Sequence, residues 1–186
     1  MLENLIALDK ELLIYLNNLG SETFDPFWLV ITKQLNWLPF FLMLFYFMKK
    51  KLSWKKVGII VLFLAFLILL TDQLTNLVKY SVERLRPCNT EDIKSMIRIV
   101  KTSSSFSFFS GHASNSSATM LFLFLILRRY YKHAYLVFIF PLIFAYSRIY
   151  LSLHFPGDIL VGFVVGIING TIFYKLFQWM ERKYNI

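Results

Sequence analysis

The stretch that decides the fold is SRIYLSLHFPGD, residues 147–158, which joins two long apolar runs. It carries Arg148, His154 and Asp158, although ionisable side chains at membrane depth cost about 2.5–3.5 kcal/mol each on the insertion scale and are rarely idle. Pro156 cannot stand inside a continuing helix. One helix should therefore end near His154, and the next should begin at Pro156.

The order of residues in this stretch suits nucleophilic catalysis. Asp158 would lie in the first turn of the new helix, where its carboxylate can hold the His154 ring and fix its tautomer. The histidine could then be the nucleophile itself. For this stretch alone, the alternative is a helix–turn–helix in which His154 and Asp158 only cap exposed helix ends.

Composition places the chain among polytopic α-helical membrane proteins. Of the 186 residues 57% are hydrophobic, 20 are phenylalanine, and the mean hydropathy is +0.56. A soluble domain of this size does not need so many apolar residues. Only helices or closed barrels span lipid, and the long unbroken apolar runs are not those of a barrel. We expect a single domain over residues 1–186.

Cysteine content and charge narrow the partners. Cys88 is the single cysteine, which excludes an intrachain disulfide and a cysteine-based metal site, and the sequence indicates no role for it. The net charge of +9 could suggest nucleic acid, but the basic residues cluster at the ends of apolar runs, as membrane topology requires. We expect a lipid bilayer and no nucleic acid as partner. The first three residues also lack the basic region of a cleavable signal peptide.

We expect an all-α bundle of about five transmembrane helices, preceded by an amphipathic helix on the membrane surface over residues 3–19. Leucines recur there at helical spacing, at positions 5, 8, 12 and 16. The spans are expected at residues 26–48, 57–78, 111–127, 134–153 and 157–177. Polar residues at 32–36 interrupt the first one. It is either one span or a short surface helix followed by a short crossing from Trp37.

Basic clusters predict the topology. They occupy residues 49–56, 128–132 and 182–183, which we assign to the cytoplasm. The loop at residues 88–109 and the stretch at 147–158 then share the outer face. Five basic residues lie in the outer segment, against the tendency of positive charges to stay in the cytoplasm, and they suggest anion binding: Arg84, Arg86, Lys94, Arg98 and Lys101. The alternative is that the three cytoplasmic clusters simply outweigh them.

Two further groups of residues fit a phosphate. Lys79, Glu83 and Arg86 are spaced i, i+4, i+7, which predicts a shared helical face before Pro87, and two cations suit a multi-oxygen anion. The alternative is an exposed helix end with a Glu83–Arg86 pair.

The second group is Ser110-Gly111-His112, which opens the third span. A glycine lets the backbone approach a ligand, and a helix N-terminus is a ready anion site. His112, Asn115, Ser116 and Thr119 follow on one face, which predicts a polar cavity. The alternative is that the small polar residues mediate helix packing.

Taken together, three blocks resemble the signature of the type 2 phosphatidic acid phosphatase (PAP2) superfamily, which also includes the glucose-6-phosphatases and the vanadium haloperoxidases. The blocks are Lys79-(six residues)-Arg86-Pro87, Ser110-Gly111-His112 and Ser147-Arg148-(five residues)-His154-(three residues)-Asp158. They span residues 79–158 and agree in order, spacing and outer-face topology. The family usually has a proline before Ser-Gly-His. Phe109 stands here instead, which alters the stiffness of the loop but removes no functional group.

The resemblance implies a role for each matched residue. His154 would attack phosphorus and form a phosphohistidine, Asp158 would orient it, and His112 would protonate the leaving oxygen and then activate water. The phosphoryl oxygens would be held by Lys79, Arg86, Arg148, Ser110 and the Gly111 amide. Cations and a helix N-terminus can stabilise a transferring phosphoryl group, and the sequence offers no carboxylate cluster for Mg²⁺. We therefore expect no metal and no cofactor.

A site at the outer membrane boundary suits a membrane lipid phosphate or diphosphate. The resemblance to bacterial members makes undecaprenyl diphosphate the leading substrate. Lipid A is the first alternative, and phosphatidylglycerophosphate or phosphatidate comes next. Arg98 and Lys101 are candidates for contacts to the head group. The expected location is the bacterial inner membrane, with the active site on the outer face.

Other classes of protein are less consistent with the sequence. A catalytically silent lipid-binding or transport relative would be expected to have lost signature residues, and all of them are present. Haloperoxidases are soluble, which the apolar spans contradict. A soluble-sugar phosphatase would be distinguished by competition with free head groups.

Overall fold

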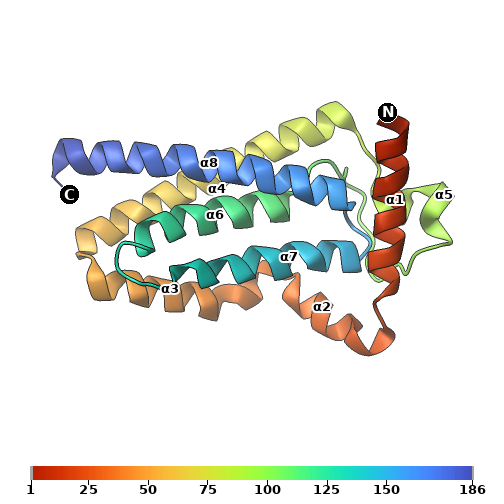
Figure 1. Ribbon diagram of the computed structural model, residues 1–186, viewed down its shortest axis with the longest axis horizontal. Coiled ribbons are helices and arrows are strands. Elements are labelled where there is room, and N and C mark those ends of the chain that lie inside the picture. Colours follow the sequence, from red (N-terminus) through yellow and green to blue (C-terminus); the bar gives the residue numbers. More distant parts are fainter. Residues whose placement is uncertain (1, 186) are drawn as a thin grey trace.

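The computed structural model describes residues 2–185, and within that range the regular structure is entirely helical (Figure 1). The α-helices are α1 (Leu2–Asn18), α2 (Asp25–Ile31), α3 (Leu38–Lys51), α4 (Trp54–Val82), α5 (Glu91–Lys94), α6 (Gly111–Leu127), α7 (Ile139–Tyr150) and α8 (Pro156–Tyr184). Short 3₁₀ turns cover residues 22–24, 34–37, 87–89 and 134–138. The all-helical fold expected from the sequence is confirmed.

The long helices α4, α6, α7 and α8 run lengthwise, and α1 lies across one end of them (Figure 1). Within the described residues, the helices that begin at Trp54 and Pro156 are long and apolar enough to cross a membrane. Two further apolar stretches, Gly111–Leu127 and Ala134–Tyr150, are shorter. The described residues thus offer two helices that could cross a membrane, or three if the bent pair α2–α3 is one span, where the sequence predicts about five crossings; the apolar segments fall at the predicted positions.

The first expected span is broken, because α2 and α3 meet at an angle of 72°. Lys33 adopts an extended conformation at the break. The carbonyls freed there are bonded by side chains: Trp37 Nε1 donates to Ile31 O at 2.8 Å, and Asn36 Nδ2 donates to Val30 O at 2.8 Å. These bonds let a non-helical segment persist beside apolar helices. Residues 26–48 thus form two helices joined at a sharp bend, where the sequence has its polar interruption.

Glycines set the distance between α6 and α8, the most closely packed helices. Gly162, Gly166 and Gly170 recur at intervals of four along α8 and lie against α6. A Cβ added at Gly166 would lie 2.4 Å from the carbonyl oxygen of Ser114, and one at Gly170 would lie 2.7 Å from that of Ala118. Small residues at this spacing allow the close approach of membrane helices. The rigid pair fixes the groups that α6 and α8 contribute to the site.

The second half of helix α1 makes buried contacts with the bundle. Leu13 and Asn17 are fully buried, and Asn17 Nδ2 donates to the carbonyls of Ile149 (3.2 Å) and Tyr150 (2.9 Å) at the end of α7. The leucines at positions 5, 8 and 12 remain exposed. An apolar exposed stripe on a helix that lies across the bundle end suits the surface of a membrane.

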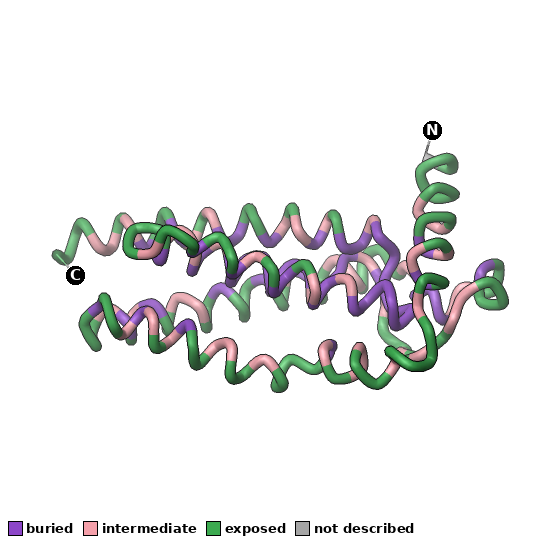
Figure 2. Tube along the Cα trace, turned by 60° about the horizontal axis from the view of Figure 1, so that its bottom comes forward, coloured by how far each residue is buried: buried purple, intermediate pink, exposed green. Residues whose placement is uncertain are grey.

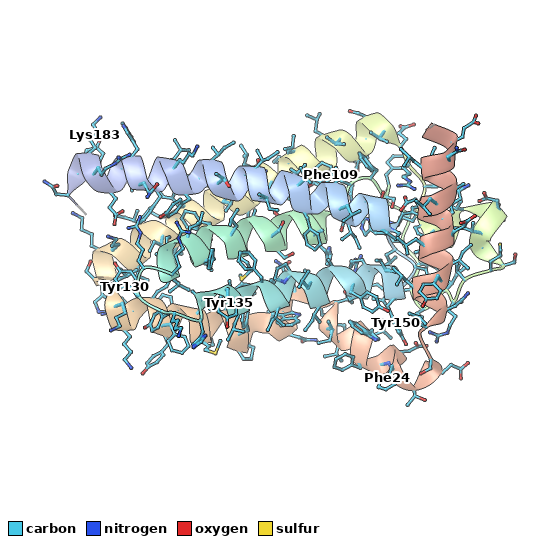
Figure 3. All side chains as sticks on the ribbon, viewed as in Figure 1. Phe24, Phe109, Tyr130, Tyr135, Tyr150 and Lys183 are labelled. Atoms are coloured by element: carbon cyan, nitrogen blue, oxygen red, sulfur yellow. The ribbon has the colours of Figure 1, made fainter. Side chains whose placement is uncertain are left out.

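The two ends of the bundle differ in charge and burial. The three basic clusters gather at the end away from α1, where Lys183 and Tyr130 are labelled in Figure 3. Lys56 and Arg129 both pair with Glu181 of α8 there. Phe24 and Tyr150 mark the opposite end (Figure 3). Buried backbone is concentrated toward this second end (Figure 2), where the connection between α7 and α8 lies.

The connection between α7 and α8 departs from expectation at its start. Helix α7 ends at Tyr150, four residues before His154. Ser152 adopts a left-handed conformation (φ 60°), and Leu153 N then donates to Arg148 O at 2.9 Å. This turn ends the helix early. Helix α8 begins at Pro156, as the sequence predicts.

Candidate active site

A cavity of about 260 Å³ opens among α3, α4, α6 and α7. Six residues with expected roles line it: Lys79, Arg86, Gly111, His112, Arg148 and His154. The remaining lining residues are Gln34, Phe41, Ile68, Asp72, Thr75, Asn76, Asn115, Ser116, Thr119, Phe140 and Phe144. Residues far apart in the sequence thus surround one space, with the cations and both histidines together.

His154 lies in the connection between α7 and α8, with only 1% of its surface exposed. Its Nε2 is 3.2 Å from Arg86 Nη1, and its Nδ1 is 3.4 Å from Asp158 Oδ2. A guanidinium donates but cannot accept, so Nε2 is the acceptor and Nδ1 carries the proton that faces the carboxylate. This tautomer leaves the lone pair on Nε2, beside the cavity, where a nucleophile is required.

The charge state of His154 follows from its surroundings. Burial, and then the positive charges of Arg86, Arg148 and Lys79, lower the pKa of His154 well below the usual 6.5. The lowered pKa favours the neutral form of the His154 imidazole. A neutral ring is the form that can attack phosphorus.

Asp158 sits behind His154 and is completely buried. Its Oδ2 accepts from Phe155 N at 2.9 Å and from the hydroxyl of Ser107. Its Oδ1 pairs with Arg84 Nη1 at 2.7 Å. A carboxylate in the first turn of a helix also benefits from the positive end of the helix dipole. These contacts hold Asp158 at a fixed position against the imidazole.

The support for Asp158 continues to the surface helix. Arg84 Nη2 pairs with Asp9 Oδ2 of α1 at 2.7 Å, and Asp9 Oδ1 accepts from Gly157 N at 2.7 Å. The Arg84 guanidinium also lies over the Phe155 ring, 4.0 Å from its centre. Helix α1 is thus connected through Asp9 and Arg84 to the carboxylate that contacts His154.

Three cations surround the cavity. Arg86 is held by Ser105 O (Nε, 2.8 Å), Leu153 O (Nη1, 2.8 Å) and Ser105 Oγ (Nη2, 2.9 Å). Arg148 donates from Nη1 to Thr32 Oγ1 at 2.5 Å, while its buried Nε has no partner among residues 2–185. Such clustered positive charge with spare donors suits an anion with several oxygens.

His112 stands in the first turn of α6 and stacks on Phe144, with ring centres 4.7 Å apart. Gly111 lines the cavity beside it. Ser110, in contrast, is fully buried and does not line the cavity. It caps α6 by accepting from Ala113 N at 3.4 Å, and its own N donates to Asp158 O at 3.0 Å. Its contacts are those of a residue that joins the start of α6 to α8.

The remaining predicted contacts lie elsewhere. Arg98 forms an ion pair with Asp25 at 2.9 Å and lies over the Tyr150 ring, outside the cavity. Lys101 is exposed in the same loop and does not line the cavity. The structure therefore places both away from Lys79, Arg86, Gly111 and Arg148, the four cavity residues that we expect to bind phosphate and that we call the phosphate cradle.

One expected geometry is wrong. Lys79, Glu83 and Arg86 do not share a helical face, because α4 ends at Val82 and Glu83 is left-handed (φ 51°). Arg86 reaches the cavity from an extended segment instead. The Glu83–Arg86 pair is not formed in the described part of the chain. The helix stops because Leu85 to Pro87 must run extended toward the α7–α8 connection, where Cys88 N donates to Ser152 O at 3.1 Å.

Four residues that contact the site were not identified from the sequence: Asp9, Thr32, Arg84 and Ser107. The sequence indicates Arg84 only as one of several basic residues in the outer segment. Ser107 lies three residues before Ser110, close enough in sequence to be considered with it. Asp9 and Thr32 contact partners more than 70 residues away, and no local pattern indicates such contacts.

The sequence profile described as the PAP2 superfamily matches residues 60–182. The chain belongs to the PAP2 superfamily. A lipid A 4'-phosphatase of Bacteroides thetaiotaomicron is 33% identical over 94% of this chain and 79% of its own length. Another, of Porphyromonas gingivalis, is 26% identical over 98% of this chain and 78% of its own length. The PAP2 resemblance expected from the three sequence blocks is confirmed, and the chain is a lipid phosphatase.

Solved structures agree on the fold. The PAP2-type phosphatidylglycerolphosphate phosphatase of Bacillus subtilis superposes with a TM-score of 0.68 at 21% identity, covering 97% of this chain and 88% of that one. The LpxE structure of Aquifex aeolicus gives a TM-score of 0.62 at 25% identity, covering 89% of this chain and 93% of that one.

Among residues 2–185, no three His, Cys, Asp or Glu side chains are grouped so that they could hold a metal ion.

Proposed function

We propose that this protein hydrolyses the phosphate ester of lipid A, at the 4' position, through a phosphohistidine on His154. The observation that supports this substrate is the similarity of nearly the whole chain to two lipid A 4'-phosphatases. It favours the first alternative from the sequence over undecaprenyl diphosphate, the leading expectation, because neither of these relatives is named for a diphosphate.

The first step of the proposed reaction is transfer to the enzyme. The cradle holds the phosphoryl oxygens, and His154 Nε2 attacks phosphorus while the bond from phosphorus to the sugar oxygen breaks. Protonated His112 gives its proton to that oxygen, so the lipid leaves as an alcohol. Asp158, 3.4 Å from Nδ1, stabilises the positive charge that forms on the His154 ring.

The second step returns the enzyme to its starting state. His112, now neutral, takes a proton from a water molecule as that water attacks the phosphohistidine. The N–P bond breaks, the electron pair returns to Nε2, and inorganic phosphate is released. Three cations and the amide at the start of α6 stabilise the charge on the equatorial oxygens in both steps. We propose that no metal takes part.

We also propose that the protein lies in the bacterial inner membrane with this site on the outer face. The three basic clusters at the end away from α1 support that orientation. Accessibility of a cysteine introduced at Lys101 to an impermeant reagent in intact cells tests it. Labelling only after the cytoplasm is opened would contradict the orientation.

The test of function is phosphate release by purified protein in detergent. Lipid A, undecaprenyl diphosphate, phosphatidylglycerophosphate and phosphatidate are compared in parallel, each with EDTA. The expected result is a preference for lipid A that EDTA does not reduce and that His154→Ala abolishes. A preference for another lipid would overturn the substrate, and activity that Mg²⁺ restores after EDTA would overturn the metal-free mechanism.

A further inference from the structure

The cavity carries polar groups that the proposed mechanism does not use. Beyond the phosphate cradle it is lined by Asp72 and Asn76 of α4 and by Asn115 of α6. We call these three residues the inner polar wall. They share the cavity with Lys79 and His112, so a ligand held by the cradle can extend to them.

The position of the inner polar wall follows from helix geometry. Asn115 stands three residues after His112, on the same face of α6 and about 5 Å further along it. Asp72 precedes Lys79 by seven residues, which is two turns or about 10 Å along α4. Both helices have the cradle toward the end where α1 lies (Figure 1). The wall is therefore deeper in the bundle than the phosphate.

The hydrogen-bonding capacity of these side chains is only partly used by the described residues. The Oδ1 of Asn115 is buried and has no hydrogen-bond partner among residues 2–185. The Asp72 carboxylate accepts from Asn76 Nδ2 at 3.3 Å. A buried polar atom without a hydrogen bond, such as Asn115 Oδ1, destabilises the folded state, and an ionisable side chain at membrane depth usually marks a functional site. The wall thus has the character of a binding surface.

The chemistry of the wall selects its ligand. A carboxylate only accepts hydrogen bonds, and an amide both accepts and donates, so a fitting group carries O–H or N–H donors. In the proposed mechanism His112 protonates the leaving oxygen, and Asn115 lies next to His112 on the same face of α6. The wall therefore faces the alcohol that leaves. The sugar of lipid A carries hydroxyl and amide N–H groups beside its phosphate, whereas the diacylglycerol of phosphatidate offers only ester oxygens.

We propose that the inner polar wall is a head-group subsite that binds the donors of the leaving sugar and thereby selects against glycerolipids without them. This inference rests on the proposed function, since it assigns a substrate feature to the same cavity. A site built to bond such donors discriminates strongly against substrates that lack them, because its own polar groups are then left unpaired.

The test compares kcat/KM on lipid A and on phosphatidate for Asn115→Leu and Asp72→Asn. We expect each variant to lose about 10- to 100-fold on lipid A, as one lost hydrogen bond of about 1–3 kcal/mol implies, and to keep its activity on phosphatidate. Gln73→Leu is the matched control, since Gln73 is exposed on α4 and does not line the cavity. It should keep both activities. Asp72 is also exposed, so Asp72→Asn tests the subsite without a folding defect.

Equal losses on both lipids, or no loss on either, would overturn the subsite. A failure of the proposed function gives a different result, in which the unchanged protein prefers phosphatidylglycerophosphate to lipid A. The leaving alcohol of that lipid still carries a free hydroxyl. The ratio of its kcat/KM to that of phosphatidate then decides the subsite: a fall in Asn115→Leu supports it, and a constant ratio refutes it.

Discussion

Replacing Gly166 with alanine tests whether the close approach of α6 and α8 holds the site together. The new Cβ would lie 2.0 Å from Ser117 Oγ and 2.4 Å from the backbone oxygen of Ser114. The hydroxyl can rotate away, but the carbonyl belongs to helix α6 and cannot. The two helices must then separate by about 1 Å, since carbon and oxygen need more than 3 Å. Overpacking of this kind costs about 1–3 kcal/mol.

Gly58→Ala is the matched control, because nothing lies within 4 Å of a Cβ at that position in α4. Both substitutions replace a helical glycine with alanine and gain about 1 kcal/mol of helix propensity. The difference between the two variants therefore reports the overpacking cost alone. We expect Gly166→Ala to be less stable than Gly58→Ala by about 1–3 kcal/mol in unfolding experiments in detergent.

Turnover should follow the same pattern. Helix α6 carries His112 and α8 carries Asp158, so separating the helices shifts the acid–base group relative to the nucleophile. A misplacement of about 1 Å can cost about 100-fold in rate. Equal stability and equal kcat for Gly166→Ala and Gly58→Ala would refute the view that these glycines set the geometry of the site.

Three further outcomes are expected. His154→Ala and His112→Ala should each abolish turnover while the protein still inserts in the membrane, and near-normal phosphate release by either would contradict the mechanism. Burial and neighbouring cations hold the pKa of His154 below 6.5 in the folded protein, so its neutral form contributes stability above pH 6.5 that is lost as the pH falls toward the lowered pKa. The unfolding temperature should therefore drop less below pH 6.5 in His154→Gln than in the unchanged protein. Identical pH profiles of the two proteins would exclude this contribution of His154. Asp9→Asn removes the charge that holds Arg84 and should lower kcat about 10-fold with little change in KM. The control Glu11→Gln, on the exposed side of α1, should leave kcat unchanged. Equal kcat in the two variants would show that Asp9 has no positioning role.

Local patterns were sufficient for much of the site. A proline after an apolar run predicts the start of α8, and the Ser-Gly-His order predicts the start of α6, because helix ends obey rules that concern only neighbouring residues. The helical period placed His112 and Asn115 on one face, and both line the cavity. The signature blocks predict Lys79, Arg148 and His154 as site residues, and all three line the cavity.

The same local reasoning failed where the backbone leaves the helix. Extending the helical period through Glu83 put Arg86 on a face of α4, but Glu83 is left-handed and Arg86 is extended. The sequence predicts that α7 ends near His154, although the left-handed Ser152 stops it earlier. Glycine is the residue that normally indicates a left-handed conformation, and neither Glu83 nor Ser152 is a glycine. The sequence therefore does not predict where these two helices end.

The sequence by itself determined that this is a helical membrane phosphatase with two histidines, an aspartate and clustered cations, because apolar period and motif spacing are local properties. Only the tertiary structure decided which groups support them. In the Asp9–Arg84–Asp158 connection, Asp9 lies 75 positions from Arg84 and 149 positions from Asp158 in the sequence. Arg148 contacts Thr32 across 116 positions. Such contacts depend on how α1 and α2 pack against the bundle end. Packing is set by the shape of the whole chain, so no short segment encodes it.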